Sequence, residues 1–368
     1  MSALAQQHGA INLSQGFPDF DCSPRLQALV DKHMRAGHNQ YAPMAGLLYL
    51  REQIAEKTEN LYQAVYRPDT EVTITSGATQ AIFTAIATVV RPGDEVIYFE
   101  PAYDCYTSAV KLFGGIPRAV TLTAPGFRIP WDDVGRMITP RTRLIIINTP
   151  NNPSAKVLSA EDMNLLARLT DGTDILIVSD EVYEHMTYDG LPHQSVCRFG
   201  NLRERSFIVA SFGKLYHNTG WKIGYCLAPD YLTTAFRAIH QYLVFSVNTP
   251  MQHALAEFLN DQEEYLRLGM FFQEKRDLFS TGLEASAFKA LPSEGTYFLI
   301  ADYSAISMSD DLSFCKELTT SQGVAAIPLS SFYSTPPSQH LIRFCFAKKT
   351  ETLKKALEKL IRIPARRS

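Results

Sequence analysis

The sequence predicts an α/β protein with a mostly parallel central sheet that helices cover on both faces. Short apolar runs rich in Val and Ile alternate with helix-like segments between residues 72 and 227. Parallel strands need long crossover connections, which are usually helical, so this alternation favours a parallel sheet over a set of hairpins. The 368 residues exceed one ordinary domain, so we expect two domains, or a large domain with a smaller one appended.

The expected elements follow in chain order. Ser23 and Pro24 are the N-cap and first-position residues typical of a helix start, and a helix is predicted over about 24–36. A second helix is expected over about 47–62. The expected strands are 72–75, 95–99, 119–122, 144–147, 175–178, 207–210 and 223–227, and the helix-like segments between them are 78–90, 104–113 and 160–169.

Composition and charge exclude several classes of function. A net charge of -3 gives no general reason to expect nucleic acid or an anionic membrane as a partner. Six scattered cysteines, without a C-x-x-C pair or a metal-like pairing with histidine, favour reduced thiols in a cytoplasmic protein and no metal site. The first eight residues lack the charged and apolar regions of a signal peptide, and no apolar run reaches the roughly 20 residues of a membrane span.

Candidate binding residues lie in the loops that follow strands, where ligands of open α/β sheets bind. The loop 76–80 (SGATQ) precedes a helix, so backbone N–H groups and a hydroxyl could bind an anion there, although Gly and Thr are equally good helix caps. Tyr103 follows the next strand, where its ring could stack on a planar ligand or pack in the core.

Three further loops carry polar groups. Pro150 and Pro153 enclose Asn152 in a rigid turn that could aim an amide, or that is only a turn. Asp180 leaves an apolar strand three residues before Tyr183, and a buried carboxylate is costly unless it meets a cation. The loop 211–225 contains two lysines eight residues apart. A desolvated lysine can become a neutral amine that condenses with an aldehyde, while a second cation holds an anion.

One ligand would use all five loops. Pyridoxal 5'-phosphate has an aldehyde, a phosphate, a flat ring, a phenolic oxygen and a protonatable ring nitrogen. These groups match, in that order, Lys214; the 76–79 loop with Ser211 and Lys222; Tyr103; Asn152 with Tyr183; and Asp180. A carboxylate beside the ring nitrogen keeps it protonated, which makes the ring an electron sink for charge that develops at a substrate Cα.

Longer motifs carry a family resemblance. They are QGFPDF at 15–20, NQY at 39–41, EPAYDCY at 100–106, NTPNNP at 148–153, SDEVY at 179–183, SFGK at 211–214, TGWK at 219–222, HQYLVFSVNTP at 240–250, GVAAIPL at 323–329 and IRFCF at 342–346. Nearly the whole chain resembles the class I/II aminotransferases of pyridoxal-phosphate fold type I. Within them it resembles the methionine and kynurenine aminotransferase branch, and bacterial methionine aminotransferases in particular.

The resemblance implies a role for each site residue. Lys214, Asp180 and Tyr183 would be catalytic. Lys214 would be the Schiff-base lysine, Asp180 would contact the pyridine nitrogen, Asn152 and Tyr183 the 3'-oxygen, Tyr103 the ring face, and Gly77, Ala78, Thr79, Ser211 and Lys222 the phosphate. Arg343 would bind the substrate α-carboxylate, helped by Asn152 and the backbone of Gly16. A guanidinium fork suits a planar carboxylate, and the alternative for Arg343 is a structural ion pair.

The same resemblance implies the reaction and the assembly. An amino acid, methionine or an aromatic one, would donate its amino group to a 2-oxo acid by a ping-pong mechanism through a lysine aldimine. Tyr41, Phe245, Tyr297 and Phe332 are candidate apolar walls of the side-chain pocket. A homodimer is expected in which Tyr41 reaches the neighbour's phosphate and Phe245 lines its substrate pocket.

The expected domains are a large cofactor-binding domain over 37–268 and a small α+β domain over 269–368, which the N-terminal segment 1–36 joins. Strands at 296–300 and 341–346 would form the sheet of the small domain. Family members usually carry a further segment before the position of Ala10, so we expect that wall of the substrate pocket to be truncated or built differently.

Two rival functions remain open from the sequence. A pyridoxal-phosphate-dependent β-lyase that acts on cysteine conjugates would use the same cofactor residues. A non-enzymatic regulator of this fold would need an added basic DNA-binding module, and the chain has no residues left for one.

Overall fold

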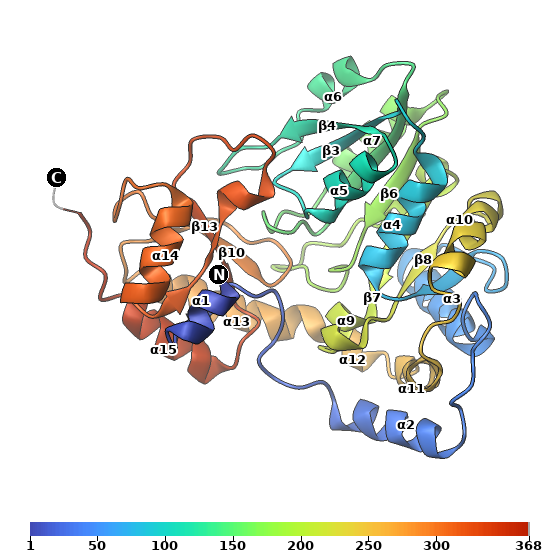
Figure 1. The fold of residues 1–368 in the computed structure, drawn as a ribbon, viewed down its shortest axis with the longest axis horizontal. Helices are drawn as coiled ribbons and strands as arrows, with labels where there is room; N and C mark the ends of the chain where they lie inside the picture. The colour runs from blue at the N-terminus through green and yellow to red at the C-terminus, as the bar shows by residue number, and fades with distance from the viewer. Residues whose placement is uncertain (367–368) are drawn as a thin grey trace.

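The computed structural model describes residues 1–366 and confirms an α/β architecture in which three sheets are surrounded by helices (Figure 1). The helices are α1 Ser2–Gln7, α2 Pro24–Arg35, α3 Leu48–Tyr62, α4 Ala78–Val89, α5 Cys105–Leu112, α6 Trp131–Met137, α7 Ala160–Thr170, α8 Gly200–Arg203, α9 Phe212–Leu215, α10 Asp230–Leu243, α11 Thr249–Leu259, α12 Glu263–Leu266, α13 Leu268–Leu283, α14 Asp311–Ser321 and α15 Thr350–Leu360.

The largest sheet has seven strands in the order β2-β8-β7-β6-β5-β3-β4. Their bounds are β2 Val72–Thr75, β3 Glu95–Glu100, β4 Ile116–Thr121, β5 Thr142–Asn148, β6 Leu176–Asp180, β7 Ser206–Ser211 and β8 Gly224–Leu227. All neighbours are parallel except β8, which is antiparallel to both β2 and β7. The carboxyl ends of β2, β5, β6 and β7 therefore lie along one edge of the sheet.

Residues on the two faces of this sheet belong to two different cores. On one face, Leu144 and Ile146 of β5 pack in a cluster with residues of α4, α5 and α10. On the other face, Ile145 and Ile147 pack in the larger cluster, which includes residues of α3 and α7. This alternation is the two-residue period of a strand that is buried on both sides, and it explains why the parallel strands are apolar throughout.

A second sheet has the order β12-β13-β10-β9 and is antiparallel. Its strands are β9 Lys289–Ala290, β10 Phe298–Asp302, β12 Ile327–Pro328 and β13 Leu341–Cys345. The N-terminal segment lies beside it: β1 (Ile11–Asn12) pairs in parallel with β11 (Val324–Ala325), and the Cys345 N–H donates to the Leu13 carbonyl at 2.7 Å. Figure 1 shows α1 next to α14 and α15, whereas α2 packs against α11.

The predicted bounds lie within three residues of the observed ones, and two of the differences have physical reasons. β4 starts at Ile116 rather than at 119, because it is the edge strand of the sheet, where the missing N–H of Pro117 breaks no ladder bond. The strand predicted over 296–300 is β10, from Phe298 to Asp302. Thr296 has φ of +64°, which no strand residue adopts, so the strand begins after it.

Two local predictions differ in detail. β6 extends to Asp180, so this residue ends the strand itself rather than beginning the loop. Ser23 occupies the N-cap position of α2, but its side chain makes no capping hydrogen bond. No helix among residues 1–366 combines the length and the apolar character that crossing a bilayer requires.

Candidate active site

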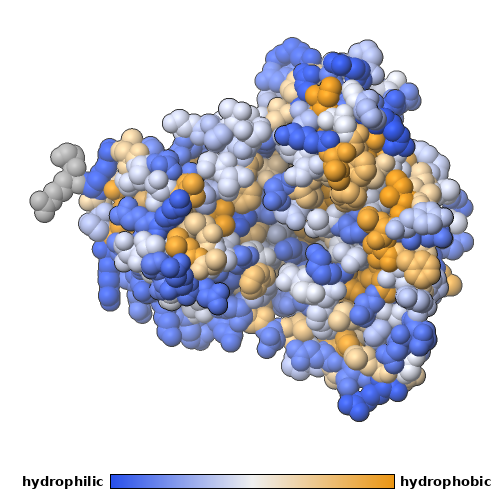
Figure 2. All heavy atoms as spheres, in the orientation of Figure 1, coloured by the Kyte–Doolittle hydropathy of each residue, from blue (hydrophilic) through white to orange (hydrophobic). Residues whose placement is uncertain are grey.

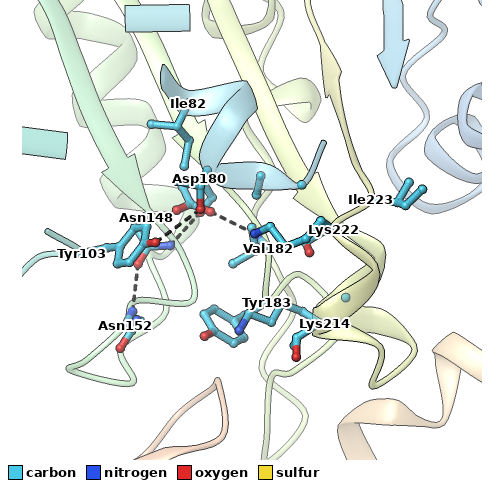
Figure 3. Close-up of a pocket in the computed structure, with 16 residues that line it drawn as sticks. Ile82, Tyr103, Asn148, Asn152, Asp180, Val182, Tyr183, Lys214, Lys222 and Ile223 are labelled. Carbon is cyan, nitrogen blue, oxygen red and sulfur yellow. Dashed lines mark hydrogen bonds between the residues drawn. The ribbon is translucent and has the colours of Figure 1, made fainter. Parts of the chain in front are cut away.

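A pocket lies at the carboxyl edge of the large sheet (Figure 3). Ten of the residues that the sequence singles out line it: Gly77, Ala78, Thr79, Tyr103, Asn152, Asp180, Tyr183, Ser211, Lys214 and Lys222. They come from segments up to 145 positions apart (77 to 222), and the aligned ends of β2, β5, β6 and β7 bring them together. Ile82, Asn148, Val182, Gly213, Thr219 and Ile223 complete the lining.

One end of the pocket has the features of an anion site. Gly77 precedes the 12-residue helix α4 with φ of +80°, and a Cβ added there would lie 3.2 Å from Lys222 Nζ. Gly224, in β8, has no room for a side chain, because its Cβ would lie 2.6 Å from the Ala210 carbonyl oxygen and 3.0 Å from the Ala78 nitrogen. The two glycines thus bring the helix N-terminus and a lysine together, and both attract negative charge.

Asp180 ends β6 in the floor of the pocket and is 4% exposed. The Tyr106 hydroxyl donates to its Oδ2 at 2.6 Å, and the Val182 N–H donates to Oδ1 at 3.3 Å. Within residues 1–366 it forms no ion pair. Burial therefore raises the pKa of Asp180 to about 6, because two hydrogen bonds and the more distant Lys214 offset only part of the desolvation.

Lys214 lies in the short helix α9, which directly follows β7. Its Nζ donates to the Tyr297 hydroxyl at 2.7 Å and to the Gly16 carbonyl at 3.3 Å, and the Tyr297 hydroxyl itself donates to the Gly16 carbonyl at 2.5 Å. Burial lowers the pKa of Lys214 to about 8. A substantial fraction of this amine is therefore neutral near pH 7 to 8, which a solvated lysine never is.

Arg343 lies on β13 of the small sheet and is 6% exposed. Its Nη1 donates to Asn152 Oδ1 at 2.6 Å, its Nη2 donates to the Ser14 carbonyl at 3.1 Å, and its Nε is buried without a partner. The guanidinium lies between two rings, with its Cζ 3.9 Å from the centre of Phe298 and 4.8 Å from that of Phe332. No carboxylate among the described residues pairs with it, so the structural ion pair considered from the sequence is absent there.

The turn that carries Asn152 is shaped by Asn148, at the end of β5. Asn148 Nδ2 donates to the Asp180 carbonyl at 2.9 Å, and its Oδ1 accepts from the Asn152 N–H at 2.8 Å (Figure 3). One side chain therefore ties the amide turn to the end of the neighbouring strand. Its signal in the sequence was its position at the end of a predicted strand.

Sequence reasoning missed two tyrosines besides Asn148. Tyr106 was part of a recognised motif but had no role assigned, and it is the principal hydrogen-bond donor to Asp180. Tyr297 was expected only as an apolar wall, whereas its hydroxyl contacts Lys214. Tyr297 is more than 80 positions from Lys214 in the sequence (297 and 214), so no local pattern could reveal the contact.

Six residues predicted for the site or its walls do not line this pocket: Gly16, Tyr41, Phe245, Tyr297, Phe332 and Arg343. Tyr41 and Phe245 are 80% and 53% exposed, and their rings pack edge to face at 5.1 Å. Gly16 and Arg343 also do not line the cavity itself, but they reach its residues through Lys214 and Asn152.

The chain is similar to known proteins along almost its whole length. The family model described as aminotransferase class I and II matches residues 8–360. The methionine aminotransferase of Escherichia coli is 52% identical over 361 residues, which cover 98% of this chain and 94% of that protein. Human kynurenine–oxoglutarate transaminase 1 is 34% identical over 97% of this chain and 93% of its own length.

Solved structures agree with the sequence comparison. A crystal structure from Escherichia coli, reported with a methionine aminotransferase function, superposes with a TM-score of 0.97 at 52% identity and covers 98% of this chain and 96% of that one. The N-succinyldiaminopimelate aminotransferase of Mycobacterium tuberculosis gives a TM-score of 0.96 at 38% identity, with 99% and 96% covered.

Proposed function

This chain belongs to the class I and II aminotransferases, and we propose that it uses pyridoxal 5'-phosphate to move the amino group of methionine or an aromatic amino acid to a 2-oxo acid. The single observation that carries the proposal is Arg343. A buried guanidinium with two donors on neutral oxygens and a third without a partner is costly unless an anion joins it. The α-carboxylate of an amino acid is such an anion, and it has the planar shape that a guanidinium fork fits.

The residues of the pocket fit the cofactor. Asp180 is a buried acid with no cation beside it, and the Gly77 cradle brings a helix N-terminus to Lys222. A protonated ring nitrogen would give the Asp180 carboxylate a cationic partner. A phosphate would bind at the helix N-terminus beside Gly77 and Lys222, where Ala78, Thr79 and Ser211 also lie. When bound, the cofactor supplies a carbonyl that takes up the amino group and a ring that accepts electrons from the substrate Cα.

Each side chain then has one task. Asp180 holds a proton at the ring nitrogen, and Tyr106 keeps the carboxylate oriented through its hydrogen bond to Oδ2. Asn152 and Tyr183 would hold the phenolic oxygen, and Tyr103 would lie against the ring. Burial raises the pKa of the Tyr183 phenol, so the phenol stays protonated and can act as a hydrogen-bond donor.

Lys214 would be the base that removes the proton from the substrate Cα, and the same amine, once protonated, would return it as an acid. Its pKa of about 8 suits both directions near neutral pH, because a catalyst of proton transfer works best when its pKa is close to the working pH. The Tyr297 hydroxyl and the Gly16 carbonyl hold the amine in place between transfers.

Substrate preference follows from what surrounds Arg343. Phe298 and Phe332 flank the guanidinium, Tyr297 packs 4.8 Å from Phe298, and no arginine lines the pocket among the described residues. A distal carboxylate such as that of aspartate would therefore meet aromatic carbon instead of a cation. An apolar side chain is favoured, in agreement with the methionine substrate named for the E. coli relative.

We also propose a cytoplasmic homodimer in which Tyr41 and Phe245 contribute to the neighbour's site. Within each chain we propose a large domain over 37–268 and a small domain that combines 269–368 with the N-terminal segment 1–36. Lys214, Gly16 and Tyr297 join these parts around the reacting amine. Movement of the small domain would therefore open or close the site directly. No contact among the described residues favours β-elimination over amino transfer.

The test compares Arg343→Lys with the unaltered enzyme in single half-reactions across a panel of amino acids. Lysine cannot make two parallel hydrogen bonds to the substrate α-carboxylate, so methionine binding should weaken about 100-fold, because a hydrogen bond to a charged group contributes about 1.5–3 kcal/mol. Cofactor affinity should stay within about twofold. Methionine and aromatic donors should exceed aspartate and glutamate in the unaltered enzyme.

The matched control is Arg118→Lys. Arg118 is on the edge strand β4, where it pairs with Glu95 of β3, and it does not line the pocket. Equal losses of cofactor and methionine affinity in Arg343→Lys would mark Arg343 as a structural residue. A preference for acidic donors would contradict the proposed substrate class.

A further inference from the structure

Three histidines form a cluster outside the active site, where α2 and α11 meet. His33 is in the last turn of α2, His38 is in the loop that follows, and His253 is on α11. One ring nitrogen of each lies within 4.8 Å of the others. The ring centres are 5.3 Å (His33–His38), 5.1 Å (His33–His253) and 3.9 Å (His38–His253) apart.

The end of α2 fixes two of these rings together. The Gly37 N–H donates to the Met34 carbonyl, and the His38 N–H donates to the His33 carbonyl at 3.1 Å, while Gly37 has φ of +89°. These are the two hydrogen bonds of a Schellman motif, which brings the residue after the glycine against the residue five positions before it. In most proteins that contact is hydrophobic, but here both partners are histidines.

Glu257 determines which nitrogen of His33 is free. It lies one turn after His253 on α11, and its Oε2 is 3.2 Å from His33 Nε2. Lys32 donates to both oxygens of Glu257 at 2.9 and 2.7 Å, so the carboxylate is paired with a cation as well as with the ring. The ionised carboxylate only accepts, so the proton of His33 is on Nε2 and the lone pair is on Nδ1.

His33 Nδ1 is a buried acceptor with no hydrogen-bond donor among the described residues. Buried polar atoms are nearly always satisfied, so an orphan acceptor on a ring that packs against two more imidazoles needs an explanation. A stack of rings held only by packing would not provide a partner for it. A metal ion would, because neutral imidazole nitrogens are its ligands, and a carboxylate on the far nitrogen is the usual support for a metal-binding histidine.

We propose that His33, His38 and His253 bind a divalent transition metal ion of the zinc class, with Glu257 as the residue that orients His33. Three imidazoles with no thiolate suit zinc, cobalt, nickel or copper rather than magnesium or calcium. The three nitrogens leave a fourth tetrahedral position for water. The sequence predicts no metal site, because His253 is more than 200 positions from His38 and only the packing of α2 on α11 joins them.

The site would fasten a segment that leads toward Tyr41. The Thr249 hydroxyl, at the start of α11, donates to the Gln40 carbonyl at 2.7 Å and accepts from the Ala42 N–H at 3.0 Å. A metal ion between His38 and His253 adds a second link between the same segment and the same helix. The metal is therefore structural and lies apart from the pocket around Lys214.

The test is zinc titration of the tag-free holoenzyme, with a chromophoric chelator as competitor and cobalt(II) absorption as a second readout. We expect one zinc ion per chain, an intense cobalt spectrum typical of tetrahedral coordination, and a rise in melting temperature with zinc. His253→Leu should weaken zinc binding more than about 100-fold. Glu257→Gln should weaken it about 10-fold, because losing the group that orients a metal-binding histidine costs about 10- to 100-fold in metal affinity.

His8→Ala is the matched control, because His8 is exposed and directly follows α1, which lies apart from α2 and α11 (Figure 1). The zinc affinity of this variant should equal that of the unaltered protein. Equal zinc binding by His253→Leu and the unaltered protein would overturn the proposal, and so would the absence of saturable zinc binding by the unaltered protein. Should His253→Leu fail to fold, the cobalt spectrum of the unaltered protein decides, since a weak octahedral spectrum contradicts three imidazole ligands.

Discussion

Burial shifts the pKa values of the two reactive ions in the pocket in opposite directions, both toward the neutral form. The pKa of Asp180 rises to about 6 and that of Lys214 falls to about 8, with desolvation as the largest cause for each. Neither ion has a charged partner within reach in residues 1–366. Each ion loses hydration energy on burial, and a ligand with a group of opposite charge would offset that cost. The pocket is therefore prepared to bind such a ligand.

Asp180→Asn should separate stability from activity. The pKa of Asp180 in the folded protein lies above the unfolded value of about 3.9. The protonated carboxyl group therefore contributes fully to stability below about pH 3.9, and this contribution is lost as the pH rises through about 6. In cofactor-free protein, Asp180→Asn should thus be more stable than the unaltered chain at about pH 8, by on the order of 2–3 kcal/mol, and similar at about pH 4. Urea unfolding at both pH values measures this difference.

The loaded Asp180→Asn enzyme should be slower by orders of magnitude in the methionine half-reaction, because the amide cannot hold a proton at the ring nitrogen. Asp310→Asn is the control, since Asp310 caps α14 and is far from the pocket. Near-normal turnover in Asp180→Asn would contradict its role, and unchanged stability at about pH 8 would contradict the raised pKa.

At the scale of elements, a buried ion pair joins α3 to the turn that carries Tyr183. Lys57 Nζ lies 2.5 Å from Glu184 Oε1, with 2% and 10% of the two side chains exposed. The hydroxyls of Tyr62 and Tyr225 also donate to Glu184, at 2.7 and 3.2 Å. Despite its burial, Glu184 has a pKa held well below the usual range, chiefly by Lys57 and His185. The pair thereby fixes the loop just after Asp180.

Removing one partner of this pair should destabilise the protein strongly. Lys57→Met leaves Glu184 as a buried carboxylate without a cation, and we expect a loss of about 3–5 kcal/mol in the free energy of unfolding. Lys57→Met combined with Glu184→Leu should recover most of the loss. Denaturant unfolding measures both variants, and a double variant no more stable than the single one would show that packing rather than the charge is responsible.

A surface control belongs to the same experiment. Arg35→Ala removes an exposed pair with Asp31 on α2, and it should leave the unfolding curve unchanged. A change as large as that of Lys57→Met would mean that the assay does not report burial.

At the scale of the whole molecule, apolar side chains remain uncovered in the single chain. Tyr41 and Phe245 pack on each other at the surface, and Tyr242 and Leu243 beside them are also exposed. Figure 2 shows hydrophobic residues gathered over the region of α4 and α10, whereas hydrophilic residues cover most of the lobe that contains α14 and α15. Large uncovered apolar areas are typical of surfaces that contact another protein, which agrees with the proposed homodimer.

If the proposed homodimer forms through this surface, Phe245→Asp should weaken it. A charge in a desolvated interface costs several kcal/mol, so sedimentation velocity should show a shift toward monomer and activity should fall with dilution. Met308→Asp is the matched control, because Met308 is 57% exposed on the hydrophilic lobe. A Phe245→Asp protein that sediments and reacts like the unaltered one would remove Phe245 from the interface.

Much of the fold could be predicted because its signals are local. The buried strands of the large sheet are continuous apolar runs, and the β-rich and helical segments alternate at crossover spacing. The bounds that differed depended on context: Pro117 is tolerated because β4 is an edge strand, and the positive φ of Thr296 delays the start of β10 to Phe298. Neither the position of a strand at the edge of a sheet nor the φ angle of a residue can be predicted from the identity of a single residue.

The sequence by itself determined the parallel α/β architecture and the ten pocket residues that follow strands, because the carboxyl ends of such strands always converge at one edge. Only the tertiary structure decided which groups support them. Tyr106 below Asp180, Tyr297 and Gly16 around Lys214, and the orphan Nε of Arg343 depend on contacts between segments far apart in the chain. The physical reason is that burial and partner distance set the charge of each group, and both arise only when separate segments pack.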